Sequence, residues 1–168
     1  CKVQKINKRK VIEVYKSNSI NNRYQISIST KEQDTELAFH RHDVYAVELG
    51  QHETNRAGRL GDSIDAYNVN VVVSVSGELA GFISLTPPDK HSFSIDKYFK
   101  RSDLPFTVDE SIWESRLLTV FKKYRGSVIV GLLMYGALRW VESHGGKKIV
   151  IIGHRKISKM YKRLGFEP

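Results

Sequence analysis

The sequence is poor in cysteine and contains no long hydrophobic run. Cys1 is the only cysteine, which excludes an internal disulfide framework and a cysteine-based zinc cluster. The 6 histidines have no metal-ligand spacing, so no metal site is expected. The most apolar segment, 128–141, is interrupted by Gly131, Gly136 and Arg139 and falls short of the ~18 residues of a membrane span. No apolar core of a signal peptide follows the lysine-rich start, so we expect a cytoplasmic protein.

Acidic residues are scarce at both ends of the chain, and the formal net charge is +9. Residues 121–168 hold 11 basic and 2 acidic residues, whereas residues 32–120 hold 8 basic and 15 acidic residues. A basic surface of this kind attracts a polyanion or an acidic partner. Nucleic acid, a phosphate-bearing co-substrate and an acidic carrier protein all fit this pattern.

The length of 168 residues fits a single domain. Because the chain starts at Cys1 rather than Met, we expect it to be part of a longer protein. Residues 1–22 are interpreted as an N-terminal extension or an extra strand. Residues 87–111 are interpreted as a lid-like excursion, because connections this long are uncommon unless they form lids or binding loops.

Hydrophobic alternation and turn residues predict a series of strands and helices. The expected strands are Val11–Tyr15, Tyr24–Ile28, Val69–Ser76, Leu79–Thr86, Ile112–Phe121 and Lys148–Ile152. The expected helices run from Thr30 or Asp34 to about Leu49, with Leu37, Val44 and Val47 on one side, and cover Ser127–His144, Lys156–Leu164 and a short stretch near Ile95–Lys100. The order of strands and helices fits crossover units, which predicts an α/β (α+β) fold with a mixed, partly parallel sheet.

The second half of the chain resembles the core of the GNAT acyltransferase superfamily. A strand leads through Lys122-Lys123-Tyr124-Arg125-Gly126 into an apolar helix, and a second strand leads into a helix that carries Tyr161 and ends at Leu164-Gly165-Phe166. The resemblance implies a GNAT-like mixed central sheet with helices on both faces. A helix N-terminus with free N–H groups suits a phosphate, so Arg125, Gly126 and Ser127 are expected to contact a donor phosphate.

The first half contains motifs similar to those of acyl-homoserine-lactone (autoinducer) synthases and N-acyl amino acid synthases. They occur in the order Arg41-x-x-Val44-Tyr45, Asp62-x-x-Asp65-x-Tyr67, Leu85-Thr86-Pro87 and Trp113-Glu114-Ser115-Arg116. The resemblance covers roughly residues 37–166. It implies transfer of an acyl group from acyl carrier protein to an amine.

Two departures from these families narrow the expected reaction. Ser84 stands where autoinducer synthases carry an arginine, which argues against the lactone-forming reaction on S-adenosylmethionine. Val128 and Val130 stand where the acetyl-CoA signature carries small residues, which favours a donor with a single phosphate, as on acyl carrier protein. An N-acyltransferase that uses an amino acid or a similar small amine fits better.

Acyl transfer from a thioester needs a base for the amine, donors for the carbonyl oxygen and an acid for the thiolate. The resemblance implies Glu114 as base with Arg116 beside it, Tyr161 as acid, backbone N–H groups near Leu118 and Val120 for the carbonyl, and Arg41, Asp62 and Asp65 for the acceptor. No permanently bound cofactor is expected, because acyl-CoA or acyl-phosphopantetheine serves as co-substrate. The expected partners are an acidic acyl carrier protein and a small amine.

Simpler interpretations stay open. Glu114 and Arg116 would form a surface ion pair, and Asp62 and Asp65 would cap a turn. The whole chain could also be a basic nucleic-acid-binding module, although no nucleic-acid motif is present. A further alternative is a GNAT-like domain that binds or regulates without chemistry. Two features support the last alternative: the glycine signature is eroded at Val128 and Val130, and the chain stops soon after Phe166, whereas this fold usually adds two closing strands. Those strands are missing, supplied elsewhere or replaced by N-terminal strands.

Overall fold

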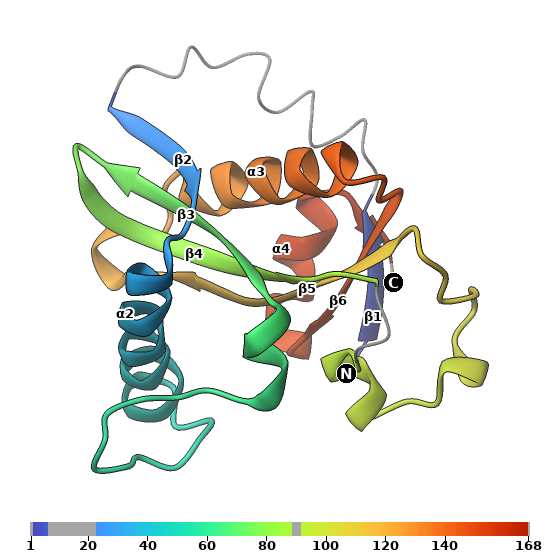
Figure 1. Ribbon diagram of the computed structural model, residues 1–168, viewed down its shortest axis with the longest axis horizontal. Coiled ribbons are helices and arrows are strands. Elements are labelled where there is room, and N and C mark those ends of the chain that lie inside the picture. Colours follow the sequence, from blue (N-terminus) through green and yellow to red (C-terminus); the bar gives the residue numbers. More distant parts are fainter. Residues whose placement is uncertain (1, 7–22, 89–91, 168) are drawn as a thin grey trace.

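One seven-stranded sheet organises the protein (Figure 1). The computed structural model describes residues 2–6, 23–88 and 92–167. The strands are β1 (Lys2–Ile6), β2 (Tyr24–Ile28), β3 (Val69–Val75), β4 (Glu78–Thr86), β5 (Ile112–Val120), β6 (Lys148–Gly153) and β7 (Phe166–Glu167), and they lie in the order β2-β3-β4-β5-β6-β1-β7. β5 and β6 are parallel and the other neighbours are antiparallel, which confirms the mixed sheet. The expected strand Val11–Tyr15 lies outside the described residues.

The hairpin of β3 and β4 follows from its turn residues. Ser76 and Gly77 have φ angles of 52° and 84°, and two successive positive φ angles are characteristic of the tight hairpin turns that match strand twist. The turn lies one residue earlier than the expected Gly77-Glu78. The sequence therefore predicted the hairpin correctly and its turn within one position.

The helix α2 (Lys31–Arg41) begins where its capping residue predicts. The Thr30 Oγ1 accepts a hydrogen bond from the Gln33 backbone N–H at 3.3 Å, and the Gln33 side-chain oxygen accepts one from the Thr30 N–H at 2.9 Å. This reciprocal pair is a capping box, which satisfies two N–H groups that the helix itself leaves free. Thr30 rather than Asp34 is therefore the cap.

The helix continues past Arg41 in a wider, π-helical form over His42–Glu48. The Leu49 N–H bonds the carbonyl of Val44, five residues earlier, which defines this geometry. The wider turn shifts later side chains out of the α-helical phase. Val47 is 62% exposed, whereas Leu37 is 2% exposed, so the expectation that both lie on one apolar side is wrong.

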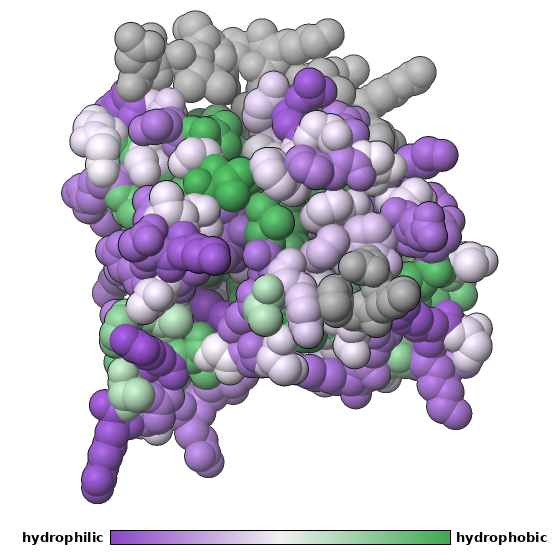
Figure 2. Space-filling model, viewed as in Figure 1, coloured by the Kyte–Doolittle hydropathy of each residue, from purple (hydrophilic) through white to green (hydrophobic). Residues whose placement is uncertain are grey.

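Helices cover both faces of the sheet, as expected. The helix α3 (Ile129–Ser143) packs on one face with the main core, and α4 (Ser158–Arg163) adds Tyr161 to the same core. On the opposite face, Leu37 of α2 packs against the buried side chains of Val72 and Phe82. The surface in Figure 2 is largely hydrophilic, with apolar residues gathered between α3 and the strands β2 to β4. None of the helices in the described ranges is long and apolar enough to cross a membrane.

The N-terminal strand lies at the far side of the sheet. β1 pairs antiparallel with β6 on one side, where Lys2 is opposite Gly153, and with β7 on the other, where Ile6 is opposite Phe166. Of the three alternatives for the closing strands, an N-terminal strand is the one that the structure contains at this place. Residues from the two ends of the chain thus share one part of the sheet.

The expected lid-like excursion is anchored to the sheet by apolar side chains. It contains two short 3-10 helices, Ser94–Lys97 and Arg101–Asp103, of which the first overlaps the helix expected near residue 95. Phe93 and Ile95 are each 1% exposed and pack against Ile112 of β5. Burying such a side chain stabilises a fold by about 1.5–3 kcal/mol, so this end of the excursion is part of the core.

Candidate active site

The sheet opens between β5 and β6. Their parallel pairing ends at Ser115 opposite Ile151, although β5 continues for five further residues. Just beyond that point, the register of β5 against β4 shifts by one residue, and Leu117 has a φ of 56°. A positive φ at a leucine costs on the order of 1–3 kcal/mol and marks a bulge that redirects the strand. This open edge of β5 contains Leu118 and Val120, whose backbone N–H groups were predicted from sequence to hold the carbonyl of the donor thioester.

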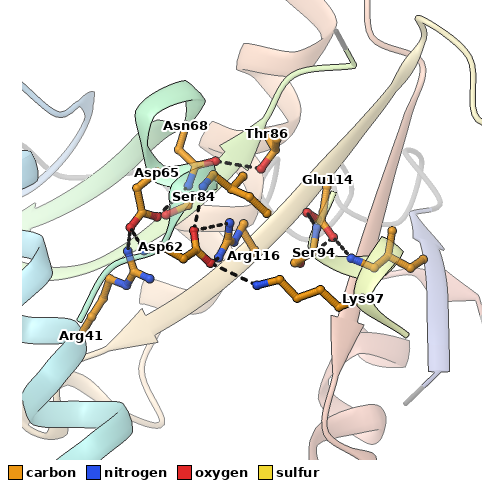
Figure 3. A network of polar contacts seen from close by, with 12 residues as sticks. Arg41, Asp62, Asp65, Asn68, Ser84, Thr86, Ser94, Lys97, Glu114 and Arg116 are labelled. Carbon is orange, nitrogen blue, oxygen red and sulfur yellow. Dashed lines mark hydrogen bonds and ion pairs between the residues drawn. The ribbon is translucent and has the colours of Figure 1, made fainter. Parts of the chain in front are cut away.

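Two arginine–aspartate pairs lie on the α2 face of the sheet, beside this bulge (Figure 3). Arg41 at the end of α2 donates to Asp65 Oδ2 at 2.6 Å. Arg116 of β5 donates to both carboxylate oxygens of Asp62. Lys97 of the excursion lies 3.6 Å from Asp62 Oδ2. The structure thus brings together the three expected acceptor residues and Arg116, and adds Lys97. We refer to these five residues as the Arg–Asp cluster.

The two aspartates also shape the loop that carries them. Asp62 Oδ1 accepts the Ile64 N–H at 3.0 Å, and Asp65 Oδ2 accepts the Asp62 N–H at 2.8 Å, which caps the 3-10 helix Ser63–Tyr67. Burial raises the pKa of Asp62, but the hydrogen bond and charge of Arg116 and the charge of Lys97 outweigh it, so the net pKa is lowered. The turn-capping interpretation therefore holds together with the ion pairs.

Both arginines of the Arg–Asp cluster are held in place by burial. Arg41 is 7% exposed and Arg116 is 8% exposed. The Nε atom of each is buried without a hydrogen-bond partner among the described residues. Burying a charge is costly unless the charge is paired, so Asp62 and Asp65 stabilise the two guanidinium groups at this position. The Nε–H group of each arginine therefore has no acceptor among the described residues.

Neutral polar groups extend this surface along β3 and β4. Thr86 donates to the Asn68 side-chain oxygen at 2.8 Å, and Asn68 Nδ2 donates to Asp65 Oδ1 at 3.2 Å. Ser84 donates to the Asn70 side-chain oxygen at 2.6 Å. The position at which autoinducer synthases carry an arginine is thus occupied by a small hydroxyl within a neutral hydrogen-bonded row.

Glu114 points toward the excursion rather than toward Arg116 (Figure 3). The side chain is fully buried and accepts hydrogen bonds from the Ser94 N–H and Oγ, both at 2.7 Å, and from the Ile95 N–H at 2.9 Å. Burial raises the pKa of Glu114, while these hydrogen bonds and the charge of Arg116 act in the opposite direction. The alternative interpretation of a surface ion pair between Glu114 and Arg116 is wrong, because Glu114 is buried and Arg116 bonds both oxygens of Asp62.

Tyr161 lies on the opposite face of the sheet, within the α3 core. It is 4% exposed, and its ring packs edge-on against Phe166 at 5.6 Å between centroids. Burial, followed by the charge of Tyr45, raises the pKa of the Tyr161 phenol. Tyr45, in the π-helical segment, donates to the Leu118 carbonyl oxygen at 3.1 Å. The two phenols therefore approach the opening in the sheet from different faces.

The expected donor-phosphate residues form the turn before α3. The Ser127 hydroxyl donates to the Tyr124 carbonyl at 2.5 Å and accepts the Ile129 N–H at 3.4 Å. Gly126 has a φ of 77°, a conformation in which glycine is strongly favoured. Arg125 donates from Nε to the Val120 carbonyl at 3.0 Å. Its two terminal nitrogens donate to the two carboxylate oxygens of Glu48.

Four residues of this region were not assigned a role from sequence. Lys97 and Ser94 belong to the excursion, whose length was the one signal available. Tyr45 ends the Arg41-x-x-Val44-Tyr45 motif, but the motif did not predict which residue it contacts. Glu48 had no signal. Across the described ranges, no group of three or more side chains suited to hold a metal ion occurs.

Comparisons with known proteins agree with this fold. The model of the acetyltransferase (GNAT) family matches residues 28–166. The solved structure of the CoA-dependent acyl-homoserine lactone synthase BjaI with SAM and isopentyl-CoA is 19% identical, with a TM-score of 0.71 over 83% of this chain and 71% of that chain. The acyl-homoserine lactone synthase LasI is 16% identical, with a TM-score of 0.66 over 85% and 78% of the two chains.

An integron cassette protein from V. cholerae is similar as well, at 15% identity and a TM-score of 0.63 over 88% of each chain. No curated protein sequence matches this chain. At these identities the solved structures show the fold, whereas the family model spans most of the sequence and confirms the resemblance. The chain belongs to the acetyltransferase (GNAT) family and is an acyltransferase.

Proposed function

We propose that this acyltransferase moves an acyl group from a phosphopantetheine thioester to the amine of an amino acid or a similar small acceptor. The donor is acyl-CoA or an acyl carrier protein. The observation that carries this proposal is the Arg–Asp cluster, which sits on one face of the sheet directly beside the bulge in β5. A thioester held at the open edge of β5 would thus meet an acceptor held by charged side chains.

The donor side is supported by the free edge of β5. The carbonyls of Leu118 and Val120 bond side chains rather than β6, so they face the opening. The N–H and C=O of one residue point the same way in a strand, so the N–H groups of these residues also face it. These N–H groups are proposed to hold the thioester carbonyl. Arg125, Gly126 and Ser127 are proposed to contact the donor phosphate. The BjaI structure, which contains isopentyl-CoA, supports a CoA-type donor.

The acceptor side is supported by unused donor groups in the Arg–Asp cluster. Arg41 and Arg116 each keep a buried Nε–H without a partner in the described part of the chain. A carboxylate of the acceptor would satisfy such groups, because arginine and carboxylate form charge-assisted hydrogen bonds. Asp62 and Asp65 are proposed to hold the acceptor's ammonium before it loses its proton. An amino acid carries both the carboxylate and the ammonium that these side chains would bind.

The proposed chemistry joins the acceptor nitrogen to the acyl carbon and releases the thiol. The ammonium first releases one proton to solvent. The resulting amine attacks the carbonyl carbon, the C–N bond forms, the C–S bond breaks, and a second proton passes from the nitrogen to Glu114. The thiolate takes a proton from Tyr161, and Glu114 returns its proton to that phenol through solvent. A raised pKa brings Glu114 closer to the value that a base needs near neutral pH. Arg116 is proposed to bind the acceptor and not to pair with Glu114.

The decisive experiment is mass spectrometry of products after incubation with acyl-CoA, acyl carrier protein thioesters and an amino acid mixture. We expect an N-acyl amino acid, and at least a hundredfold lower rate for Tyr161→Phe, since a positioned acid or base contributes about 10²–10⁴. Tyr98→Phe is the matched control, because Tyr98 is 63% exposed. A turnover with no dependence on Tyr161 would remove its role as acid.

A second candidate is a GNAT-like domain that binds without chemistry. Two contacts favour it, because both oxygens of Glu114 and both terminal nitrogens of Arg125 are already bonded. In that case the purified chain would bind acyl thioesters and release no product. Binding of oligonucleotide but not of any acyl thioester would instead favour the basic nucleic-acid-binding module. The same incubation, followed by a competition pulldown, distinguishes the three.

A further inference from the structure

Glu48 makes a contact that neither the fold nor the proposed reaction explains. Its carboxylate accepts hydrogen bonds from both terminal nitrogens of Arg125, one of them at 2.8 Å, although the two residues are 77 positions apart in the sequence. The side chains of Glu48 and Arg125 are 36% and 38% exposed, so the pair lies at the surface. A guanidinium binds a phosphate in the same way, through two parallel N–H···O bonds.

The rest of the Arg125 side chain is directed at the opening in the sheet. Its Nε bonds the Val120 carbonyl at 3.0 Å, on the edge of β5 that lacks a β6 partner. Gly126 and Ser127 follow directly and lead into α3, whose first N–H groups are the other groups suited to an anion. Glu48 is therefore a negative charge held at the mouth of the region where an anionic donor would enter.

We propose that Glu48 is a specificity residue for the donor, an internal carboxylate that occupies the position on Arg125 which the donor's phosphate takes. This inference rests on the proposed function only in assuming that Arg125 meets a phosphate-bearing donor. The carboxylate must leave Arg125 when the phosphate binds, so every phosphate-bearing donor competes with it. A donor without phosphate does not compete.

The competition reaches further because of where Glu48 stands. It ends the π-helical segment His42–Glu48, which follows Arg41 of the Arg–Asp cluster and carries Tyr45 on the Leu118 carbonyl. Release of Glu48 removes the side-chain contact that ties one end of this segment to Arg125. The other end of the segment borders the acceptor site. Donor binding and acceptor binding are therefore expected to influence each other through these seven residues.

The test compares Glu48→Gln with the unaltered chain in two assays. The first measures binding of CoA and of pantetheine, which lacks phosphate, by titration calorimetry. The second measures KM for an acyl-CoA and for the acyl thioester of N-acetylcysteamine, which also lacks phosphate. Glu78→Gln is the matched control, since Glu78 forms an exposed ion pair with Lys123 at 2.7 Å, two residues before Arg125.

We expect Glu48→Gln to bind CoA about fivefold more tightly, because a well-formed exposed ion pair is worth up to about 1 kcal/mol. Binding of pantetheine and KM for the cysteamine thioester should not change, and Glu78→Gln should change nothing. In an Arg125→Ala background, Glu48→Gln should have no effect. Tighter CoA binding without any acyl transfer would uphold the role of Glu48 and contradict the proposed function.

Three results would overturn the proposal. Unchanged or weaker CoA binding by Glu48→Gln would show that the carboxylate does not compete with phosphate. An equal change for donors with and without phosphate would assign Glu48 a structural role. An effect of the same size in Glu78→Gln would reduce it to the general charge of the surface. Acyl transfer that continues alongside any of these would leave the proposed function intact.

Discussion

The buried carboxylate of Glu114 allows stability and catalysis to be separated in a pair of variants. In Glu114→Gln, the remaining oxygen can still accept from the Ser94 hydroxyl and the Ile95 N–H, but the new amide group meets the Ser94 N–H, which is itself a donor. One charge-assisted hydrogen bond is lost, and such a bond contributes about 1.5–3 kcal/mol. Relief from burying a charge offsets part of this, so we expect a loss of about 1–2 kcal/mol.

In Glu114→Ala all three hydrogen bonds disappear, and the N–H groups of Ser94 and Ile95 lose their acceptor inside the protein. Each buried N–H group left without an acceptor costs about 1–3 kcal/mol, and the void left by the side chain adds to this, so we expect a loss of about 3–5 kcal/mol. For a chain of this size each kcal/mol lowers the melting temperature by about 2–4 °C. We therefore expect melting temperatures about 2–8 °C lower for Glu114→Gln and at least about 6 °C lower for Glu114→Ala.

Chemical denaturation followed by circular dichroism gives both free energies of unfolding, and limited proteolysis reports on the excursion around Ser94. Activity of the better-folded Glu114→Gln variant then tests the role as base, for which a fall of 10²–10⁴ is expected. A loss of less than about tenfold in kcat/KM would remove that role. If Glu114→Ala cost less than 1 kcal/mol, the three hydrogen bonds would not anchor the excursion and the structural reasoning would be refuted.

Three further predictions concern other contacts of the site. Arg116→Ala leaves Asp62, whose side chain is 26% exposed, without its principal partner, so we expect a loss of about 1–3 kcal/mol and of acceptor binding; denaturation and KM measurements check this, and an unchanged acceptor KM would contradict it. Because the folded pKa of Asp62 is lowered, its contribution is present above pH 3.8 and is lost as pH falls below that value; Asp62→Asn should flatten this acid limb in melting curves. Gly153→Ala would place a Cβ 2.5 Å from the Tyr161 ring, so we expect about 1–3 kcal/mol of destabilisation and a displaced phenol, measured by denaturation and by the rate; full stability would argue against this close contact.

Local features of the sequence predicted most of the fold because their causes are local. The Thr30–Gln33 capping box fixes the start of α2, and the alternation of Tyr24–Ile28 matches β2 residue for residue. The mixed sheet that contains β5 and β6 followed from the resemblance to the GNAT core. In contrast, the π-helical turn at Val44 has no signal in residue types, and it moved Val47 from the expected core to the surface.

The site was predictable as a set of residues but not as a set of partners. Arg116 and Glu114 share one face of β5, which alternation predicts, yet each bonds a loop that is distant in sequence. Which loop reaches which side chain depends on the path of the excursion and of the Asp62 turn. The contact of Lys97 with Asp62 depends on both paths at once, so neither segment alone could reveal it.

The position of β1 has a consequence for how the chain folds. β1 lies between β6 and β7, so a strand near the start of this sequence pairs with strands near its end, with Lys2 opposite Gly153. Pairing of residues so far apart in sequence requires closure of a long loop and slows folding. Until β1 and β6 meet, each exposes an unpaired edge, and an unpaired strand edge is a template for association with other chains. Loss of Lys2–Ile6 would therefore be expected first as aggregation during expression rather than as lost chemistry.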